Sequence, residues 1–212
     1  MQNLQKYLAS EFEMKSLGDL KYFLGIEVAR SKHGIFLSRR KYILDLLAET
    51  RMLDCKPIDN PSEQNHKLRF YSDQVPTDKE CYQRLVGKLI YLAHTRPDIA
   101  YAVRVVSQFM HSSSEDHMGY VMHSLRYLKV TIGKGLMFCK YGHTDVEGCR
   151  DADWAGLVTD RRSTSGYFTF VGGNVVTWRR KKQKVVSRSS AKAEYRGMAQ
   201  GVCELPLLCF SI

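Results

Sequence analysis

The sequence has 212 residues, enough for one large domain or two small domains with a buried core. Apolar residues make up 44% and charged residues 25%, a composition typical of soluble globular proteins that excludes disorder of the whole chain. The formal net charge of +10 favours an anionic partner, which is nucleic acid first and an anionic membrane surface second, unless the charge only serves solubility.

Features that would indicate secretion or a membrane anchor are missing from the sequence. No apolar run approaches the roughly 20 residues that span a bilayer. The first ten residues lack the order of a secretory signal. The six cysteines have scattered spacings without a Cys-x-x-Cys pair, which excludes an ordinary zinc ribbon. We therefore expect an intracellular protein, cytoplasmic or nuclear and not secreted, with no membrane partner.

The first third of the chain is expected to form a β-hairpin followed by a helix. Leu20–Arg30 and Gly34–Leu37 are apolar and β-prone, and the polar link Ser31–Gly34 between them predicts a hairpin turn. Apolar residues at helical spacing then predict an amphipathic helix over Tyr42–Thr50. The polar stretch Pro57–Asp78, with three prolines, predicts an extended connection.

Three further helices are expected next. Apolar stripes at helical spacing run through residues 82–90 and 99–106, and Pro97-Asp98 between them supplies a break and a new helix start. The third helix is expected over Glu115–Lys129, behind the cap-forming serines at 112–114.

After Gly133 the apolar pattern changes from helical spacing to strands. The predicted strands are Leu136–Lys140, Tyr167–Val171 and Val175–Trp178. Gly172-Gly173 is expected to turn the last pair, and a final helix is expected from Ser189 through Val202. The change of pattern predicts a boundary between two units near Thr131–Gly135, and the fold class expected is mixed α/β.

Acidic residues of the second unit are candidates for a metal site. Asp151 and Asp153 follow a short strand-like run, Asp145–Arg150, and Glu194 lies in the first turns of the last helix. Carboxylates from a strand end and a packing helix can converge, and Mg²⁺ requires oxygen ligands of this kind. Two such ions can activate water and stabilise the leaving oxygen of a phosphodiester. The alternative is that the aspartates are solvated turn residues.

Three blocks of the second half resemble the RNase H domain of a copia-type retrotransposon Pol polyprotein. They are Val146–Gly156, Asp160–Tyr167 and Ser187–Tyr195. The resemblance implies that Asp151 is the first catalytic aspartate, that Glu194 is the catalytic glutamate, and that both bind Mg²⁺. Asp153 is the second choice for the first position, given the two-residue alternation of a strand. The family's third aspartate is expected downstream of Ile212.

The upstream half resembles the same polyprotein. Glu11–Val28 is similar to the end of the copia-type reverse transcriptase palm, and Tyr91–Tyr101 to the segment that links polymerase and RNase H. The hairpin at Phe23–Gly25 resembles the family's primer grip, so Gly25 is expected to let the backbone approach nucleic acid; otherwise it is an ordinary hairpin glycine. The polymerase's Tyr-x-Asp-Asp motif is expected before Met1.

A basic run precedes the last helix. It consists of Arg179, Arg180, Lys181, Lys182 and Lys184. One interpretation is contact with the phosphates of an RNA–DNA hybrid, and a second is a nuclear localisation signal. A third is that the lysines protect an exposed edge strand from pairing with other chains.

The resemblance implies a plan for the whole chain. Residues 1–56 correspond to the end of the reverse transcriptase palm or thumb, 57–133 to a helical connection, and 134–212 to a truncated RNase H-like domain. The parent activities are RNA-directed DNA polymerisation and hybrid-dependent RNA cleavage, with Mg²⁺ as cofactor and the remainder of the Pol polyprotein as a possible partner. Because neither catalytic site is complete, we expect an inactive enzyme-derived fragment. The alternatives are a non-catalytic nucleic-acid-binding fragment and a pseudogene relic.

Overall fold

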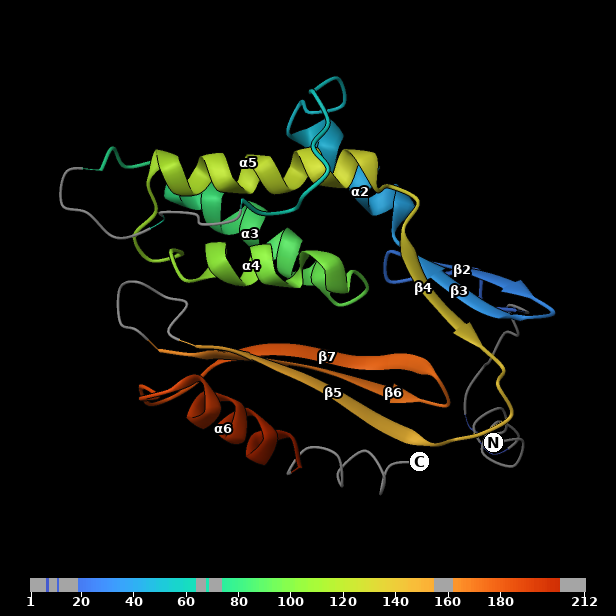
Figure 1. Cartoon of the computed structure of the whole chain (residues 1–212). Coiled ribbons are helices and arrows are strands. Elements are labelled where there is room, and N and C mark those ends of the chain that lie inside the picture. Colours follow the sequence, from blue (N-terminus) through green and yellow to red (C-terminus); the bar gives the residue numbers. More distant parts are fainter. Residues whose placement is uncertain are drawn as a thin grey trace.

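The computed structural model describes residues 7, 11, 19–63, 68, 74–154 and 162–202, without the side chains of residues 153 and 200–202 (Figure 1). Parts of three sequence blocks, around residues 12–18, 155–156 and 160–161, lie outside the described residues, as does part of the expected connection 57–78. The described elements are helices and two antiparallel sheets, which confirms a mixed α and β fold. None of the described helices is long and apolar enough to cross a lipid bilayer.

The first sheet has the strand order β1 (Tyr22–Phe23), β2 (Ile26–Ser31), β3 (Gly34–Ser38) and β4 (Gly135–Cys139). The predicted hairpin is confirmed, because β2 pairs with β3 across the link that ends at Gly34. The expected single strand Leu20–Arg30 is wrong in one respect. Leu24 and Gly25 have φ values of 46° and 72°, so the chain turns there and folds β1 back on β2.

Strand β4 joins the first sheet, although we expected this segment to open the second unit. It pairs with β3 so that Leu136 lies opposite Leu37 and Phe138 opposite Ile35. A Cβ atom on Gly135 would lie 2.1 Å from the carbonyl oxygen of Leu37, so only glycine permits this close approach. The division of the chain near residue 133 therefore stays a prediction.

The helical layer consists of α2 (Arg40–Glu49), α3 (Lys79–Ala93), η1 (Pro97–Ile99), α4 (Ala100–Ser107) and α5 (Glu115–Val130), which confirms the expected helices. The Asp78 side chain accepts hydrogen bonds from the backbone of Glu80 and Cys81 at 3.0 and 3.1 Å and so starts α3. Ser114 and His117 form a reciprocal cap at the start of α5. The fully buried side chains of this layer include Ile43, Leu47, Leu85, Leu89, Ile99 and Leu125.

The second sheet has the order β5 (Val146–Asp153), β6 (Thr164–Val171) and β7 (Asn174–Lys182), and α6 (Ser190–Val202) follows it. Gly172 and Gly173, with φ values of 51° and 71°, turn β6 into β7 as predicted. The strands are longer than expected. Asp151 and Asp153 lie within β5 instead of after it, because their pairing with β6 continues as far as Thr164.

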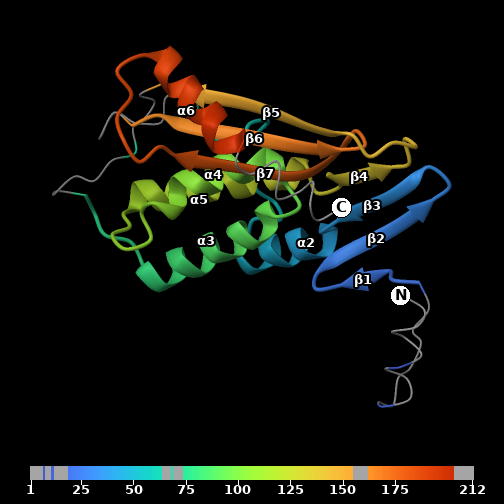
Figure 2. The ribbon, with the colours of Figure 1, turned by 90° about the horizontal axis from the view of Figure 1, so that it is seen from below.

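The second sheet lies between two helical elements, with α6 on one side and α3–α5 on the other (Figures 1 and 2). Residues directly opposite each other on paired strands share a face of a sheet. Asp151, Gly166 and Arg180 form one such row on the face toward the helical layer, which we call the layer face. The opposite side, the α6 face, carries Ala152 and Ser165, which contact the position of Gly197 in α6.

Candidate nucleic-acid interface

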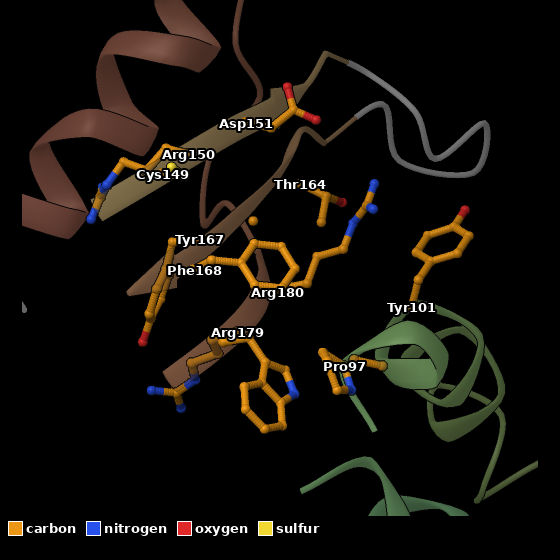
Figure 3. Close-up of a pocket in the computed structure, with 13 residues that line it drawn as sticks. Pro97, Tyr101, Cys149, Arg150, Asp151, Thr164, Tyr167, Phe168, Arg179 and Arg180 are labelled. Atoms are coloured by element: carbon orange, nitrogen blue, oxygen red, sulfur yellow. The ribbon is translucent and has the colours of Figure 1, made fainter. Parts of the chain in front are cut away.

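Asp151 and Glu194, the predicted metal ligands, come from two elements: Asp151 from β5 of the second sheet and Glu194 from α6, which packs on one face of that sheet. Arg150 extends toward α6, where its guanidinium donates to the backbone oxygens of Gly197 and Met198, the latter at 3.0 Å (Figure 3). Arg150 thus lies on the α6 face. Because side chains alternate along a strand, Asp151 lies on the layer face. Both Asp151 and Glu194 are exposed.

The physical reason for this separation is the register of β5. A shift of one residue would exchange the faces of Asp151 and its neighbours, and the bonds from Arg150 to α6 accompany the observed register. In the part of the chain that the structure describes, no group of three or more His, Cys, Asp or Glu side chains is placed to hold a metal ion. Magnesium binding by Asp151 and Glu194 therefore stays a prediction.

The basic run is divided between the two faces of the second sheet. Arg179 and Lys181 are exposed on the α6 face, opposite Tyr167 and Ser165 of β6. Arg180 and Lys182 alternate with them and lie half-buried on the layer face. Lys184 is exposed beyond the end of β7. What reads as one cluster in the sequence therefore forms two sets with different surroundings.

Positive charge is concentrated where β7 meets α4. The Arg180 guanidinium lies 4.3 Å from the centre of the Tyr101 ring, and Arg104 donates to the backbone oxygen of Arg180. Burial, followed by the charges of Arg180 and Arg179, lowers the pKa of Arg104. Because arginine stays protonated even so, the guanidinium groups of Arg104 and Arg180, with Arg179 on the other face of β7, create a positive potential that an anionic ligand would relieve.

Gly25 lies in the turn that separates β1 from β2, and residues from the helical layer support this turn. The Tyr91 hydroxyl donates to the carbonyl oxygen of Leu24. Arg39 stacks over the Tyr91 ring at 3.8 Å and donates to the Tyr91 backbone oxygen at 2.8 Å. Phe23 and Leu24 remain exposed at the tip. The sequence reasoning missed Arg39 and Tyr91, because partners 52 positions apart leave no local signal.

Gln183, which lies inside the basic run, was also missed. Its side-chain amide donates to the Ser165 hydroxyl at 2.9 Å and to the Ala193 carbonyl oxygen at 2.7 Å, and its oxygen accepts from Ser187 at 2.9 Å. The side chain is only 2% exposed. The sequence signal that could have indicated its buried position was a single uncharged residue between two lysines. Gln183 joins β6, the end of β7 and α6.

Comparisons with known proteins place these elements in a family. A family model described as reverse transcriptase (RNA-dependent DNA polymerase) matches residues 1–64. The chain is 45% identical, over 99% of its length, to the Retrovirus-related Pol polyprotein from transposon RE1 of Arabidopsis thaliana, but spans only 14% of that protein. It is 38% identical, over 89% of its length, to the Retrovirus-related Pol polyprotein from transposon TNT 1-94 of Nicotiana tabacum, of which it spans 15%.

A shorter relative is matched over most of both chains. An uncharacterized mitochondrial protein of Arabidopsis thaliana is 42% identical over 93% of this chain and 82% of its own length. No solved structure matches the chain. The polyprotein matches extend from the reverse transcriptase region through nearly the whole sequence. The chain therefore belongs to the family of copia-type retrotransposon Pol polyproteins, as a fragment that includes part of the reverse transcriptase region.

Proposed function

We propose that this part of a Pol polyprotein binds nucleic acid, preferably an RNA–DNA hybrid, through the exposed basic residues at the end of the second sheet. The observation that carries the proposal is the row formed by Arg179 and Lys181 on one face of β7, with Lys184 beyond it. Residues two apart on a strand lie about 6.8 Å from each other, so the row presents successive charges in one direction. A strand of phosphates offers matching negative charges.

The domain plan inferred from the sequence is part of this proposal. Residues 1–56 would be the end of the palm or thumb, 57–133 the connection, and 134–212 an RNase H-like unit. The three-stranded antiparallel sheet followed by α6 supports an RNase H-like unit, although β4 pairs with the first sheet. The family model for reverse transcriptase supports the first assignment. The remainder of a Pol polyprotein would be the natural covalent or non-covalent partner.

We propose that this chain does not cleave RNA–DNA hybrids on its own. In the parent enzyme, Asp151 and Glu194 would bind Mg²⁺, which activates water and stabilises the leaving oxygen. Here Asp151 lies on the layer face of the second sheet, whereas Glu194 lies in α6, which packs on the opposite face, and this separation supports the proposal. Cleavage of a labelled hybrid in Mg²⁺ should stay at the background rate, and Glu194→Gln should not change it. Cleavage that depends on Glu194 would overturn this part of the proposal.

The binding proposal is tested by the salt dependence of hybrid affinity. Each phosphate contact contributes about 0.9 to the slope of log affinity against log salt. A variant with Arg179→Gln, Lys181→Gln and Lys184→Gln should therefore have a slope that is smaller by about 2 to 3. A matched control removes three exposed charges from the helical layer and its loops, with Lys56→Gln, Lys79→Gln and Arg126→Gln. The control should keep the slope of the unmodified chain.

Two outcomes would contradict the binding proposal. An equal reduction of the salt slope in both variants would mean that only the net charge of the chain attracts nucleic acid. An unchanged slope in the first variant would mean that Arg179, Lys181 and Lys184 make no phosphate contacts, which leaves protection of the edge strand β7 as their remaining interpretation.

A further inference from the structure

A cavity of about 250 Å³ separates α4 from the layer face of the second sheet, and Gly166, which has no side chain, is part of its lining (Figure 3). Gly166 lies between Asp151 of β5 and Arg180 of β7 in one cross-strand row. A Cβ atom on Gly166 would have a single neighbour within 4 Å, the Cγ of Arg180 at 4.0 Å. We call this space the Gly166 cavity.

Aromatic side chains form one end and the roof of the Gly166 cavity. Phe168 and Trp178 are cross-strand partners in the next row, and Tyr101 approaches from α4. The Trp178 indole donates to the Ala93 carbonyl oxygen at 3.1 Å, and Arg180 is held over the Tyr101 ring. Phe168 keeps 41% of its surface exposed. Trp178 and Arg180 are therefore held in place by contacts within the chain, while Phe168 offers a free surface for stacking.

Opposite charges flank the cavity across the glycine. Asp151 and Arg180 lie on the two outer strands, whose backbones are about 10 Å apart, twice the spacing of neighbouring strands. A flat ligand over Gly166 would meet a carboxylate, which accepts hydrogen bonds, on one edge. It would meet a guanidinium, which donates them, on the other. The carboxylate disfavours a bare phosphate, and two charges disfavour a purely apolar molecule.

Guanine is the nucleobase that fits this pattern of donors and acceptors. Its O6 and N7 atoms accept two hydrogen bonds from an arginine, which is the commonest specific arginine–base contact. Its N1–H and 2-amino groups are donors that a carboxylate can accept. Its ring offers a face for stacking on aromatic side chains. The positive potential around Arg104 and Arg180 suits the phosphate that accompanies a base in a nucleic acid.

We propose that the Gly166 cavity binds one unpaired guanine base of a nucleic acid strand. Phe168 and Trp178 stack on the base, Asp151 accepts from its N1–H and 2-amino groups, and Arg180 donates to O6 and N7. This site rests on the proposed function for its nucleic acid partner, but it lies on the opposite face of β7 from the basic row that would contact the hybrid.

The test uses the full chain and free nucleotides as probes. The chain has two tryptophans, Trp154 and Trp178, so Trp154→Phe leaves Trp178 as the only indole fluorophore. In that background, guanosine monophosphate should quench the fluorescence in a saturable way. Inosine monophosphate lacks the 2-amino group and should bind at least about tenfold more weakly, as expected for one lost base contact. Equal binding of all nucleotides would overturn the guanine assignment.

Filling the cavity provides the second part of the test. Gly166→Val adds a β-branched side chain in a strand, where the Cβ meets ordinary contact distances, so the variant should fold. It should no longer bind guanosine monophosphate. The matched control, Gly87→Ala in α3, also adds a Cβ into open space and should bind normally. Normal binding by Gly166→Val would overturn the proposal.

Two further measurements keep the result unambiguous. If Gly166→Val unfolds, Asp151→Asn tests the guanine site instead. This variant should fold, because the exposed carboxylate is replaced by a side chain of the same size. It should weaken guanosine monophosphate binding at least about tenfold, and unchanged affinity would refute the site. Hybrid binding is measured on the same proteins. If the unmodified chain binds the hybrid but not guanosine monophosphate, the guanine site in the Gly166 cavity is refuted. If the unmodified chain does not bind the hybrid, the proposed function is refuted.

Discussion

The helical layer and the second sheet with α6 are held together by different forces. The helical layer buries a continuous set of large apolar side chains from α2 to α5. In the second sheet and α6, Ala193 is the one fully buried hydrophobic side chain among the described residues. Polar groups such as Ser165, Gln183 and Ser187 are buried there instead. One region is therefore stabilised by apolar burial and the other by specific hydrogen bonds.

This difference bears on function, because apolar burial is strong and tolerant of orientation, whereas buried polar groups need defined partners. The basic row and the Gly166 cavity both lie on the second sheet, the region with the smaller apolar core.

The largest effect is expected from the buried ion pair of the helical layer. Arg96 is 2% exposed and donates to both carboxylate oxygens of Asp98, at 2.9 and 2.7 Å, and to Thr131. Arg96→Gln would remove the cation beside Asp98 and leave only the hydrogen bond from Tyr127, and it should lower the free energy of unfolding by about 3 kcal/mol. Urea unfolding of the full chain measures this. Arg126→Gln, an exposed change on α5, is the control, and an equally small effect of both would contradict the account.

A cavity in the apolar core should have the next largest effect. Leu89 of α3 is fully buried within the cluster of the helical layer. Leu89→Ala should lower the free energy of unfolding by about 2–5 kcal/mol, because the space left behind adds to the lost burial. Ile90→Ala, one position along on the exposed side of α3, provides the control. A loss below about 1 kcal/mol would show that the core is not packed as described.

The corresponding change in the second region is Gln183→Ala. It removes the amide that links Ser165, Ser187 and the backbone of Ala193, and it should cost about 1–3 kcal/mol locally. Amide hydrogen exchange should become faster in α6 while α3 stays protected. Uniformly faster exchange in both helices would mean that the two regions unfold as one unit.

A smaller effect on the stability of the folded chain is expected at low pH. Burial opposes ionisation of Asp98, but hydrogen bonds from Arg96 and Tyr127 and the charge of Arg96 outweigh it, so the pKa of Asp98 is lowered. A lowered pKa stabilises the folded chain above the ordinary value of about 4, and this contribution is lost as the pH falls further. Asp98→Asn should remove that part of the acid sensitivity in thermal unfolding scans between pH 7 and 3. Identical pH dependence in both proteins would contradict this assignment.

Local patterns made much of the fold predictable. Apolar spacing located α2 to α5, and the glycine pair at 172–173 located the turn between β6 and β7. Helical periodicity and turn chemistry act over a few residues, so the sequence displays them directly. The turn at Leu24 was missed because a left-handed conformation is unusual for leucine.

Long-range pairing was not predictable in the same way. The sequence does not encode locally that β4 pairs with β3, nor on which face of β5 Asp151 lies, since both depend on registers between distant segments. The Gly166 cavity depends on three strands and α4 together, so no single segment indicates it. The family resemblance supplied the candidate residues Asp151 and Glu194, and the tertiary structure determines whether they can meet.

Amide hydrogen exchange of the full chain, measured with and without an RNA–DNA hybrid, shows directly whether the second sheet binds nucleic acid. If the second sheet binds nucleic acid, the hybrid should slow exchange in β7 and in the segment that follows it, including Lys184. Exchange in α3 and α5, which already have the apolar core behind them, should stay unchanged. Protection that appears in α3 or α5 and leaves β7 unaffected would contradict the account.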